Sequence, residues 1–186
     1  MKITGGQIRG RILAAPKNLD IRPSSNKVRE AIFNIIGQDL SGTRVLDLFS
    51  GTGLLGIEAM SRGAALGVFV DHAKQSLALM RKNLLLCGYE HKGSICKWDL
   101  AKGLPKNRAF LDTAYDLVFL DPPYGSHLVA GLIENLALSA RLAPGALIVL
   151  ETGKDSAIFP CSPLILVETR IYGDTKISIF KKEDLS

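Results

Sequence analysis

At 186 residues, the chain is long enough to bury a substantial core as one domain without help from disulfides. Apolar residues make up 47% and charged residues 22%, which is ordinary for a globular protein and excludes a disordered or fibrous one. Three widely spaced cysteines predict neither a disulfide framework nor a Cys-x-x-Cys metal site, and no apolar run is long enough to span a bilayer. We therefore expect a cytoplasmic protein without a membrane partner.

The net charge of +5 is concentrated in the first 30 residues, which carry seven basic and two acidic side chains. The rest of the chain is balanced. A basic segment attached to a neutral body is typical of a surface that contacts phosphate backbones, although a merely solvated basic face has the same composition. The basic residues of this segment are Lys2, Arg9, Arg11, Lys17, Arg22, Lys27 and Arg29.

Residues 1–40 predict a small basic extension made of a hairpin and a helix. Glycines divide residues 2–15 into two short apolar segments, which favours a hairpin with Arg9 and Arg11 on its exposed side. N-cap residues then predict a helix to about Gln38, whose basic side chains at the start are expected to reach outward. The apolar positions of this helix share one face: Val28, Ile32, Ile35 and Ile36.

From residue 41 onward, short apolar runs alternate with segments of helical periodicity. The last two runs, joined by Gly173-Asp174, predict a hairpin. The expected class is therefore α/β, with a doubly wound, mostly parallel seven-stranded sheet, a C-terminal antiparallel hairpin strand and the N-terminal extension in one domain over residues 1–186. The predicted strands are 44–50, 66–71, 94–99, 115–120, 146–151 after a Pro144-Gly145 turn, 164–172 and 176–181, and the predicted helices are 54–62, 73–87 and one around 128–136.

A glycine-rich turn follows the first predicted strand of this sheet. Gly51, Gly53 and Gly56 open a helix, and Asp71 ends the next strand at the spacing of a dinucleotide-binding turn. Asp47 precedes the turn, where its carboxylate is expected to face the ligand. Because a carboxylate repels a pyrophosphate and attracts a cationic sulfonium, the pattern favours S-adenosylmethionine over NAD.

Four predicted strands end on or near an aspartate. The carboxyl ends of parallel strands share one edge, where open α/β sheets bind their ligands. At this edge Asp71 is expected to accept hydrogen bonds from ribose hydroxyls and Asp99 from an adenine amino group, although a strand-end aspartate also caps helices. The four residues are Asp47, Asp71, Asp99 and Asp121.

Asp121-Pro122-Pro123-Tyr124 directly follows the strand predicted at 115–120. Neither proline has an amide hydrogen and each fixes its own φ, so the backbone leaves the strand as a stiff corner with carbonyl oxygens to spare. A carboxylate, a backbone acceptor and an aromatic face suit a flat ring that carries an amino group. A simple Pro-Pro turn is the alternative for this stretch.

With these motifs together, the chain resembles class I S-adenosylmethionine-dependent methyltransferases that modify exocyclic amino groups. The segments Gly6-Gln-Ile-Arg-Gly-Arg and Arg22-Pro-Ser-Ser-Asn-Lys-Val-Arg-Glu-Ala-Ile-Phe-Asn are similar to the bacterial RsmD family, and the likeness covers nearly the whole chain. Ser24-Ser25-Asn26 stands where that family often has Thr-Thr-Asp. The resemblance implies a Rossmann-like methyltransferase that modifies N2 of a guanine in small-subunit 16S rRNA, at guanine 966, with naked RNA and an assembling small subunit both open as the substrate.

An exocyclic amine is a poor nucleophile because its lone pair is shared with the ring. We expect Asp121 and the Pro122 carbonyl to accept its two N–H bonds and Tyr124 to stack on a base that is unpaired or flipped out. The residues expected to hold the cofactor are Asp47, Ser50, Gly51, Gly53, Asp71, His72, Asp99, Leu100 and Asp121. The residues expected to contact RNA are Arg9, Arg11, Arg22, Lys27 and Arg29.

Several alternatives stay open. The acceptor could be adenine N6 in nucleic acid or a protein glutamine amide, because similar Pro-Pro-Tyr corners serve both. A non-catalytic RNA-binding or ribosome-assembly protein on the same fold and an NAD oxidoreductase are the rivals from other classes. Three dispersed histidines predict no metal site. Glu151 is expected to be structural or to hydrogen-bond the Asp121 loop.

Overall fold

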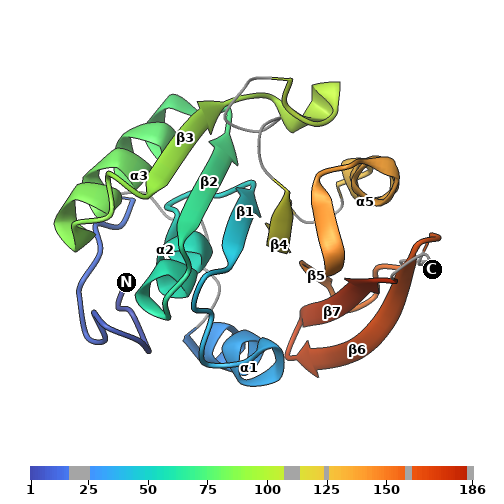
Figure 1. The fold of residues 1–186 in the computed structure, drawn as a ribbon, viewed down its shortest axis with the longest axis horizontal. Coiled ribbons are helices and arrows are strands. Elements are labelled where there is room, and N and C mark those ends of the chain that lie inside the picture. Colours follow the sequence, from blue (N-terminus) through green and yellow to red (C-terminus); the bar gives the residue numbers. More distant parts are fainter. Residues whose placement is uncertain (17–25, 107–113, 124–125, 158–160, 184–186) are drawn as a thin grey trace.

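The computed structural model of the chain describes residues 1–16, 26–106, 114–123, 126–157 and 161–183. Strands and helices alternate along it, with the labels shown in Figure 1. The helices are α1 (Asn26–Ile36), α2 (Leu54–Ser61), α3 (Lys74–Cys87), the 3-10 helix η1 (Leu100–Lys102) and α5 (Leu128–Leu138). The strands are β1 (Arg44–Leu48), β2 (Leu66–Asp71), β3 (Gly93–Lys97), β4 (Tyr115–Leu120), β5 (Leu142–Gly153), β6 (Leu164–Tyr172) and β7 (Thr175–Lys182).

All seven strands join in one sheet, in the order β3-β2-β1-β4-β5-β7-β6. Strands β1 to β5 pair in parallel, and β7 is antiparallel to both β5 and β6. The prediction of a mostly parallel sheet with an antiparallel C-terminal hairpin is therefore confirmed. The strand order reverses between β1 and β4, and the carboxyl ends of strands at such a switch point are where open α/β sheets bind ligands.

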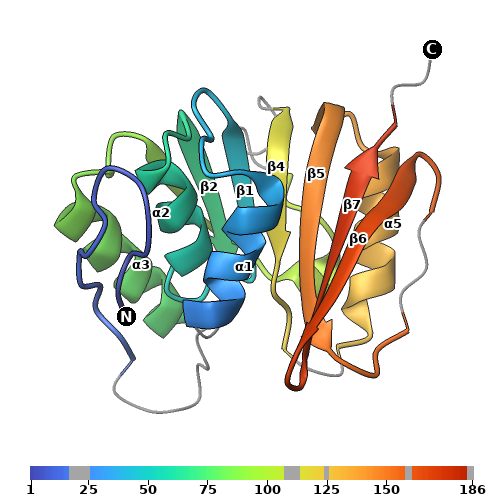
Figure 2. The same cartoon turned by 90° about the horizontal axis from the view of Figure 1, so that it is seen from below.

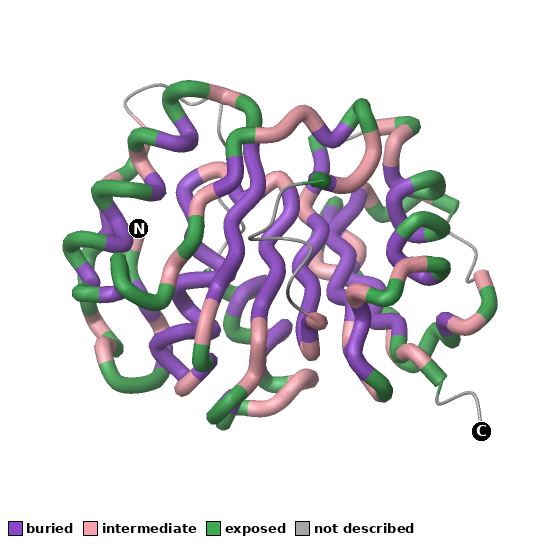
Figure 3. The backbone as a smooth tube through the Cα atoms, turned by 45° about the horizontal axis from the view of Figure 1, so that its top comes forward, coloured by how far each residue is buried: buried purple, intermediate pink, exposed green. Residues whose placement is uncertain are grey.

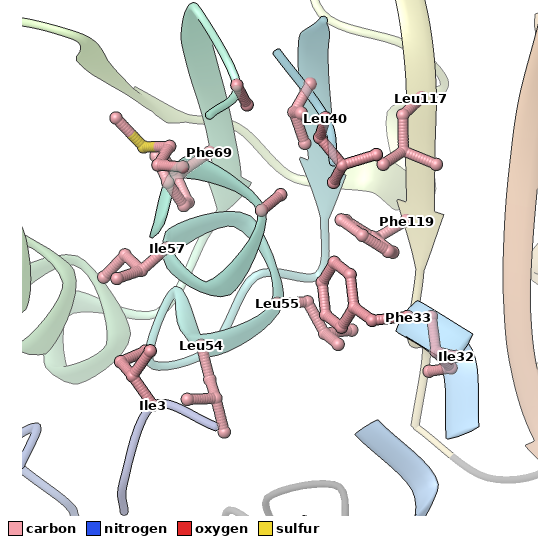
Figure 4. Close-up of a cluster of buried hydrophobic side chains, with 14 of the residues drawn as sticks. Ile3, Ile32, Phe33, Leu40, Leu54, Leu55, Ile57, Phe69, Leu117 and Phe119 are labelled. Atoms are coloured by element: carbon pink, nitrogen blue, oxygen red, sulfur yellow. The ribbon is translucent and has the colours of Figure 1, made fainter. Parts of the chain in front are cut away.

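Helices cover both faces of this sheet (Figures 1 and 2): α1, α2 and α3 on one face, and α5 on the other. Each face has its own buried apolar cluster, and β1, β2, β4, β5 and β7 are buried along most of their length (Figure 3). Successive side chains of β4 alternate between the clusters, with Phe119 in the first and Leu120 in the second. The first cluster, between the sheet and α1–α3, includes an edge-to-face contact of Phe33 with Phe119 at 5.9 Å (Figure 4).

The N-terminal segment, residues 1–16, packs over α2 and α3 on the side away from the sheet (Figures 1 and 2). An antiparallel bridge joins Lys2 to Ile12, and the amide of Ile3 donates to the carbonyl of Arg11 at 2.9 Å, so the segment is a hairpin with minimal strand character. Ile3 anchors it in the first apolar cluster. The predicted hairpin is thus present, and its contact with α2 is close: a Cβ added to Gly6, whose φ is +74°, would lie 1.9 Å from the Ser61 carbonyl oxygen.

Several boundaries differ by one or two residues from the predicted ones, with β1 ending at Leu48 instead of Ser50, and two differences change the interpretation. Pro144-Gly145 lies inside β5 instead of preceding it, and the pairing of β4 with β5 shifts register between Tyr115 and Leu117 at this level. Proline is tolerated where a strand is irregular, because its missing amide hydrogen leaves no ladder bond unmade there. β3 ends at Lys97, so Asp99 lies beyond the strand instead of ending it. No helix among the described residues is long and apolar enough to cross a membrane.

Candidate active site

The turn after β1 has a backbone path that few residues tolerate. Phe49, Gly51 and Gly53 all have positive φ, of 59°, 54° and 76°. The amide of Gly53 donates to the Ser50 carbonyl at 2.7 Å, and the Ser50 hydroxyl donates to the carbonyls of Asp47 and Val70, the latter at 3.1 Å. Ser50 therefore links the end of β1 to the end of β2 through its hydrogen bonds.

Asp71, at the end of β2, supports the same turn from the other side. Its Oδ2 accepts from the Gly51 amide and its Oδ1 from the Ala73 amide, both at 2.9 Å. The side chain is buried. A carboxylate has about four acceptor sites, so both oxygens keep capacity for a ligand hydroxyl. Its proposed bond to ribose stays a prediction.

Asp47 is a deeply buried acid of the site whose pKa is strongly raised. It is 2% exposed, and burial, with a smaller contribution from the charge of Asp71, raises its pKa to about 7. The amide of Gly56 at the start of α2 donates to its Oδ2 at 3.0 Å and opposes that rise. Gly56 leaves no room for a side chain, since a Cβ there would lie 2.4 Å from the Phe69 ring and 3.0 Å from that same oxygen. The single amide does not offset the cost of burying the Asp47 charge, so a cationic ligand at this edge would stabilise the carboxylate.

Asp99 caps the start of η1, which was the alternative to its predicted contact with adenine. It is half-buried, and its Oδ1 accepts from the Ala101 amide at 3.0 Å at the start of η1. Trp98 is tied beside it by a bond from its Nε1 to the Gly103 carbonyl at 2.9 Å, and Leu100 is buried. His72 is exposed beside the end of β2. Capping leaves the second oxygen of Asp99 available, so its proposed contact with adenine stays a prediction.

Asp121 follows β4 at the strand next to Asp47. Its amide lies 3.5 Å from the Leu48 carbonyl, which carries the β1–β4 ladder one residue past the strand. Asp121 is half-buried, Pro122 buried and Pro123 exposed. Tyr124 lies outside the described residues. The structure thus brings the Asp121-Pro122 corner next to the glycine-rich turn, as the switch point of the sheet requires.

A buried acid on β5, Glu151, extends this row of carboxylates. Leu120 pairs with Leu150, so the residues that follow them, Asp121 and Glu151, lie at the same level of adjacent strands. Glu151 is 6% exposed and stands opposite Ile177, which belongs to the cluster on the α1–α3 face. Sequence reasoning left its role open, although an acid at the end of a fifth apolar run was visible.

The residues predicted to contact RNA differ in their exposure to solvent. Arg9, Arg11 and Lys27 are exposed, and Arg22 lies outside the described residues. The prediction for Arg29 is wrong, because its side chain is wholly buried and its Nε donates to Glu58 Oε2 at 3.2 Å. The helix face that was expected to reach solvent is instead turned toward α2.

Glu58 of α2 is the centre of this buried network. It accepts from the amides of Thr4 and Gly5, from Arg29 and, at 2.9 Å, from Arg62. The network joins the N-terminal segment, α1 and α2 around one carboxylate. Sequence reasoning missed it, and the available signal was a glutamate in the otherwise apolar run Leu54–Met60.

No group of three or more histidine, cysteine, aspartate or glutamate side chains within the described ranges is arranged to hold a metal ion. The acids at the carboxyl edge are spread across successive strands and are held by backbone amides. Their arrangement fits an extended organic ligand with amino and hydroxyl groups, and the buried Asp47 fits its positive charge.

Comparison with known proteins agrees with this geometry. The family model described as Conserved hypothetical protein 95 matches residues 1–181. The chain is 32% identical over 183 residues to Bacillus subtilis YlbH, provisionally named an rRNA methyltransferase, covering 98% of this chain and 99% of that protein. It is 30% identical over 189 residues to the ribosomal RNA small subunit methyltransferase D of Escherichia coli (strain K12), covering 98% and 90%. The solved Escherichia coli protein yhhF, provisionally described as a methyltransferase, superposes with a TM-score of 0.84 at 28% identity and 98% coverage of both chains. This chain belongs to the Conserved hypothetical protein 95 family, the RsmD family of methyltransferases.

Proposed function

We propose that the protein methylates the exocyclic N2 amino group of a guanine in small-subunit 16S rRNA, at the position equivalent to guanine 966. The observation that carries the proposal is the place of the Asp121-Pro122 corner, on the strand next to the cofactor turn. Relatives named for methylation of small-subunit rRNA support the choice of substrate. Cytoplasmic action on rRNA, free or in an assembling small subunit, belongs to the same proposal.

The carboxyl edge of the sheet holds the cofactor. Asp47 would balance its positive charge, the backbone of the Ser50–Gly53 turn would contact it, and Asp71 would accept from its hydroxyls. S-adenosylmethionine would supply an activated methyl group on a positively charged sulfur that keeps the bonding electron pair, and the acceptor amine would lose one proton. The remaining residues assigned to this site are His72, Asp99, Leu100 and Asp121.

The acceptor amine is oriented by the corner after β4. Asp121 and the Pro122 carbonyl accept its N–H bonds, which draws the nitrogen toward a pyramidal shape and aims its lone pair at the methyl group. Tyr124 stacks on the base, a contact worth roughly 1–3 kcal/mol in single-strand binding. The proposal requires the guanine to be unpaired or flipped out of its helix, because N2 is otherwise engaged in pairing.

The exposed basic residues of the first 30 contact the RNA backbone. Arg9 and Arg11 lie on the N-terminal segment and Lys27 on the first turn of α1, and Arg22 belongs to the same basic stretch of sequence. Arg29 is excluded from this set by its burial. Phosphate contacts of this kind orient the RNA without reading its sequence.

The proposal is tested by incubating the protein with methyl-labelled S-adenosylmethionine and rRNA, free and in small subunits that lack the modification. Label is expected on N2 of one guanine of the small-subunit RNA, located by digestion and mass analysis. Label on adenine N6, or on protein, would contradict the substrate assignment. Absence of transfer from a protein that binds the cofactor would instead support a non-catalytic RNA-binding role.

A further inference from the structure

Glu151 occupies the β5 position next to the catalytic corner. Leu120, the last residue of β4, pairs with Leu150 of β5, so the residues that follow them, Asp121 and Glu151, come at the same level of the carboxyl edge. Side chains two residues earlier, Phe119 and Val149, both belong to the cluster on the α1–α3 face. By strand alternation Asp121 and Glu151 therefore project to that same face.

Burial at this place is expensive for a carboxylate. Glu151 is 6% exposed, and a buried charge persists only where partners compensate for lost hydration. A purely structural acid has no need to stand at the level of Asp121. A carboxylate accepts up to about four hydrogen bonds, so contacts within the protein leave room for a bond to substrate.

The two carboxylates match the edge of one purine. Guanine carries two kinds of donor side by side, the N2 amine and N1–H, whereas adenine and 2-aminopurine have a bare acceptor nitrogen at N1. Adjacent strands are about 4.8 Å apart, and glutamate reaches one methylene further than aspartate. A base whose amine is held at Asp121 can therefore present its N1 to Glu151 of β5, within the reach of one strand spacing.

We propose that Glu151 is the specificity-determining residue for guanine, accepting its N1–H while Asp121 and the Pro122 carbonyl hold the amine. The inference rests on the proposed methylation of guanine N2 and adds the basis of base selection. A base with an acceptor at N1 turns that nitrogen toward a carboxylate, where the two acceptors form no hydrogen bond with each other and repel. Sites built to pair a substrate donor reject analogues that lack it by large factors, on the order of 10⁴.

The test uses target rRNA with guanine or 2-aminopurine at the methylated position, since both bases carry an amine at C2. The RNA is presented free or in a reconstituted small subunit, whichever is methylated. Methylation is measured as kcat/KM for wild type, Glu151→Gln and the exposed-site control Glu90→Gln. Wild type and control are expected to prefer guanine by at least about 100-fold. In Glu151→Gln the preference is expected to narrow by at least about tenfold, because the glutamine amide can donate to an acceptor at N1.

Each other outcome has a distinct meaning. An equal loss on both bases in Glu151→Gln, with the guanine preference retained, would assign Glu151 a structural role and overturn the inference. Equal wild-type rates on both bases would overturn it without any variant, even if Glu151→Gln does not fold. Thermal melting and cofactor binding monitor folding in each protein. If wild type places no methyl on guanine N2, the proposed function itself fails, and the two failures are thereby separated.

Discussion

At the scale of single residues, the acids of the carboxyl edge differ because their neighbours differ. Asp71 accepts from two backbone amides, one of them in the glycine turn, whereas Asp47 accepts from one and is more deeply buried, at 2% against 9% exposed. Burial disfavours the charged form of Asp47, so a nearby cation would stabilise its carboxylate. Neighbouring positions on one sheet edge thus acquire different chemical tasks.

Replacing Asp121 with alanine is expected to lower turnover by a factor of about 10² to 10³, the range for losing one well-placed electrostatic group in a reaction site. Cofactor affinity is expected to fall far less than turnover, because the glycine turn, Asp47 and Asp71 supply the other contacts and are intact. Rate measurements with saturating cofactor, paired with calorimetric cofactor titration, check both parts. Methylation at a near-normal rate would remove Asp121 from the catalytic assignment.

Asp47 predicts a pH dependence for cofactor binding. The free protein has an Asp47 pKa of about 7, so below pH 7 the bound cation must first displace a proton. Affinity is therefore expected to rise roughly tenfold per pH unit up to pH 7 and to level off above it. Asp47→Asn should bind more weakly at pH 8 and lose this dependence. Calorimetric titration between pH 5.5 and 8.5 measures it, and a parallel pH profile for wild type and variant would contradict the role.

The same shift predicts the sign of a stability change. The folded pKa of Asp47 is raised above the ordinary value of 3.8, so the folded protein binds the proton more tightly and loses stability as pH rises from about 4 to 7. Above pH 7 the full cost applies, roughly 4 kcal/mol at most. Asp47→Asn without cofactor is expected to unfold at higher urea concentration than wild type at pH 8, with the gap closing toward pH 4.

At the scale of elements, the N-terminal segment and α1 are attached to the catalytic core through one buried carboxylate. Glu58 accepts from the amides of Thr4 and Gly5 and pairs with Arg29 and Arg62. α2 begins directly at the cofactor turn, so the network links the basic extension to the helix that supports Asp47. The extension is therefore positioned relative to the active site through this contact.

Removing the charge of Glu58 is expected to be severely destabilising. Glu58→Gln leaves two buried guanidinium groups without their anion, a change that typically costs about 3–5 kcal/mol. The matched control is Asp116→Asn, which breaks the partly exposed pair with Arg44 and is expected to cost about 1 kcal/mol or less. Urea unfolding compares the two, and equal losses would show that burial does not govern the Glu58 network.

At the scale of the whole molecule, positive charge gathers on the N-terminal extension and acids gather at the carboxyl edge of the sheet. Of the basic residues in the first 30, those described and exposed include Lys2, Arg9, Arg11 and Lys27, whereas Arg29 is part of the core. An RNA substrate can thus meet a basic surface with its backbone and an acidic edge with one base. This separation suits an enzyme that holds phosphates at one place and an amine at another.

Reversing the charge of Arg9, Arg11 and Lys27 together is expected to weaken RNA binding and to flatten its salt dependence. Each lost phosphate contact lowers the slope of log affinity against log salt by about 0.7 to 0.9. Lys181→Glu, an exposed change on β7, is the control and should leave the slope in place. Binding titrations from low to moderate salt measure the slopes. Identical slopes for the triple variant and wild type would place the RNA surface elsewhere.

Much of the fold could be predicted because its signals are local. Apolar runs with glycine and aspartate at their ends located the strands, and β2, β4 and β6 begin and end where predicted. The glycine turn could be recognised because its backbone requires positive φ at Gly51 and Gly53, and glycine adopts positive φ readily. Pro144-Gly145 was mistaken for a turn, since a bulge inside a paired strand has the same local composition as a loop.

The sequence by itself determined the succession of strands and helices along the chain, the nucleotide-type turn and the acids at strand ends, because each depends on residues close in sequence. Only the tertiary structure decided that Arg29 is buried against Glu58 and that Glu151 stands beside Asp121. Both facts depend on which elements become neighbours in space. For a basic residue at a helix start or an acid at a strand end, the surrounding sequence does not indicate which distant residue will pack against it.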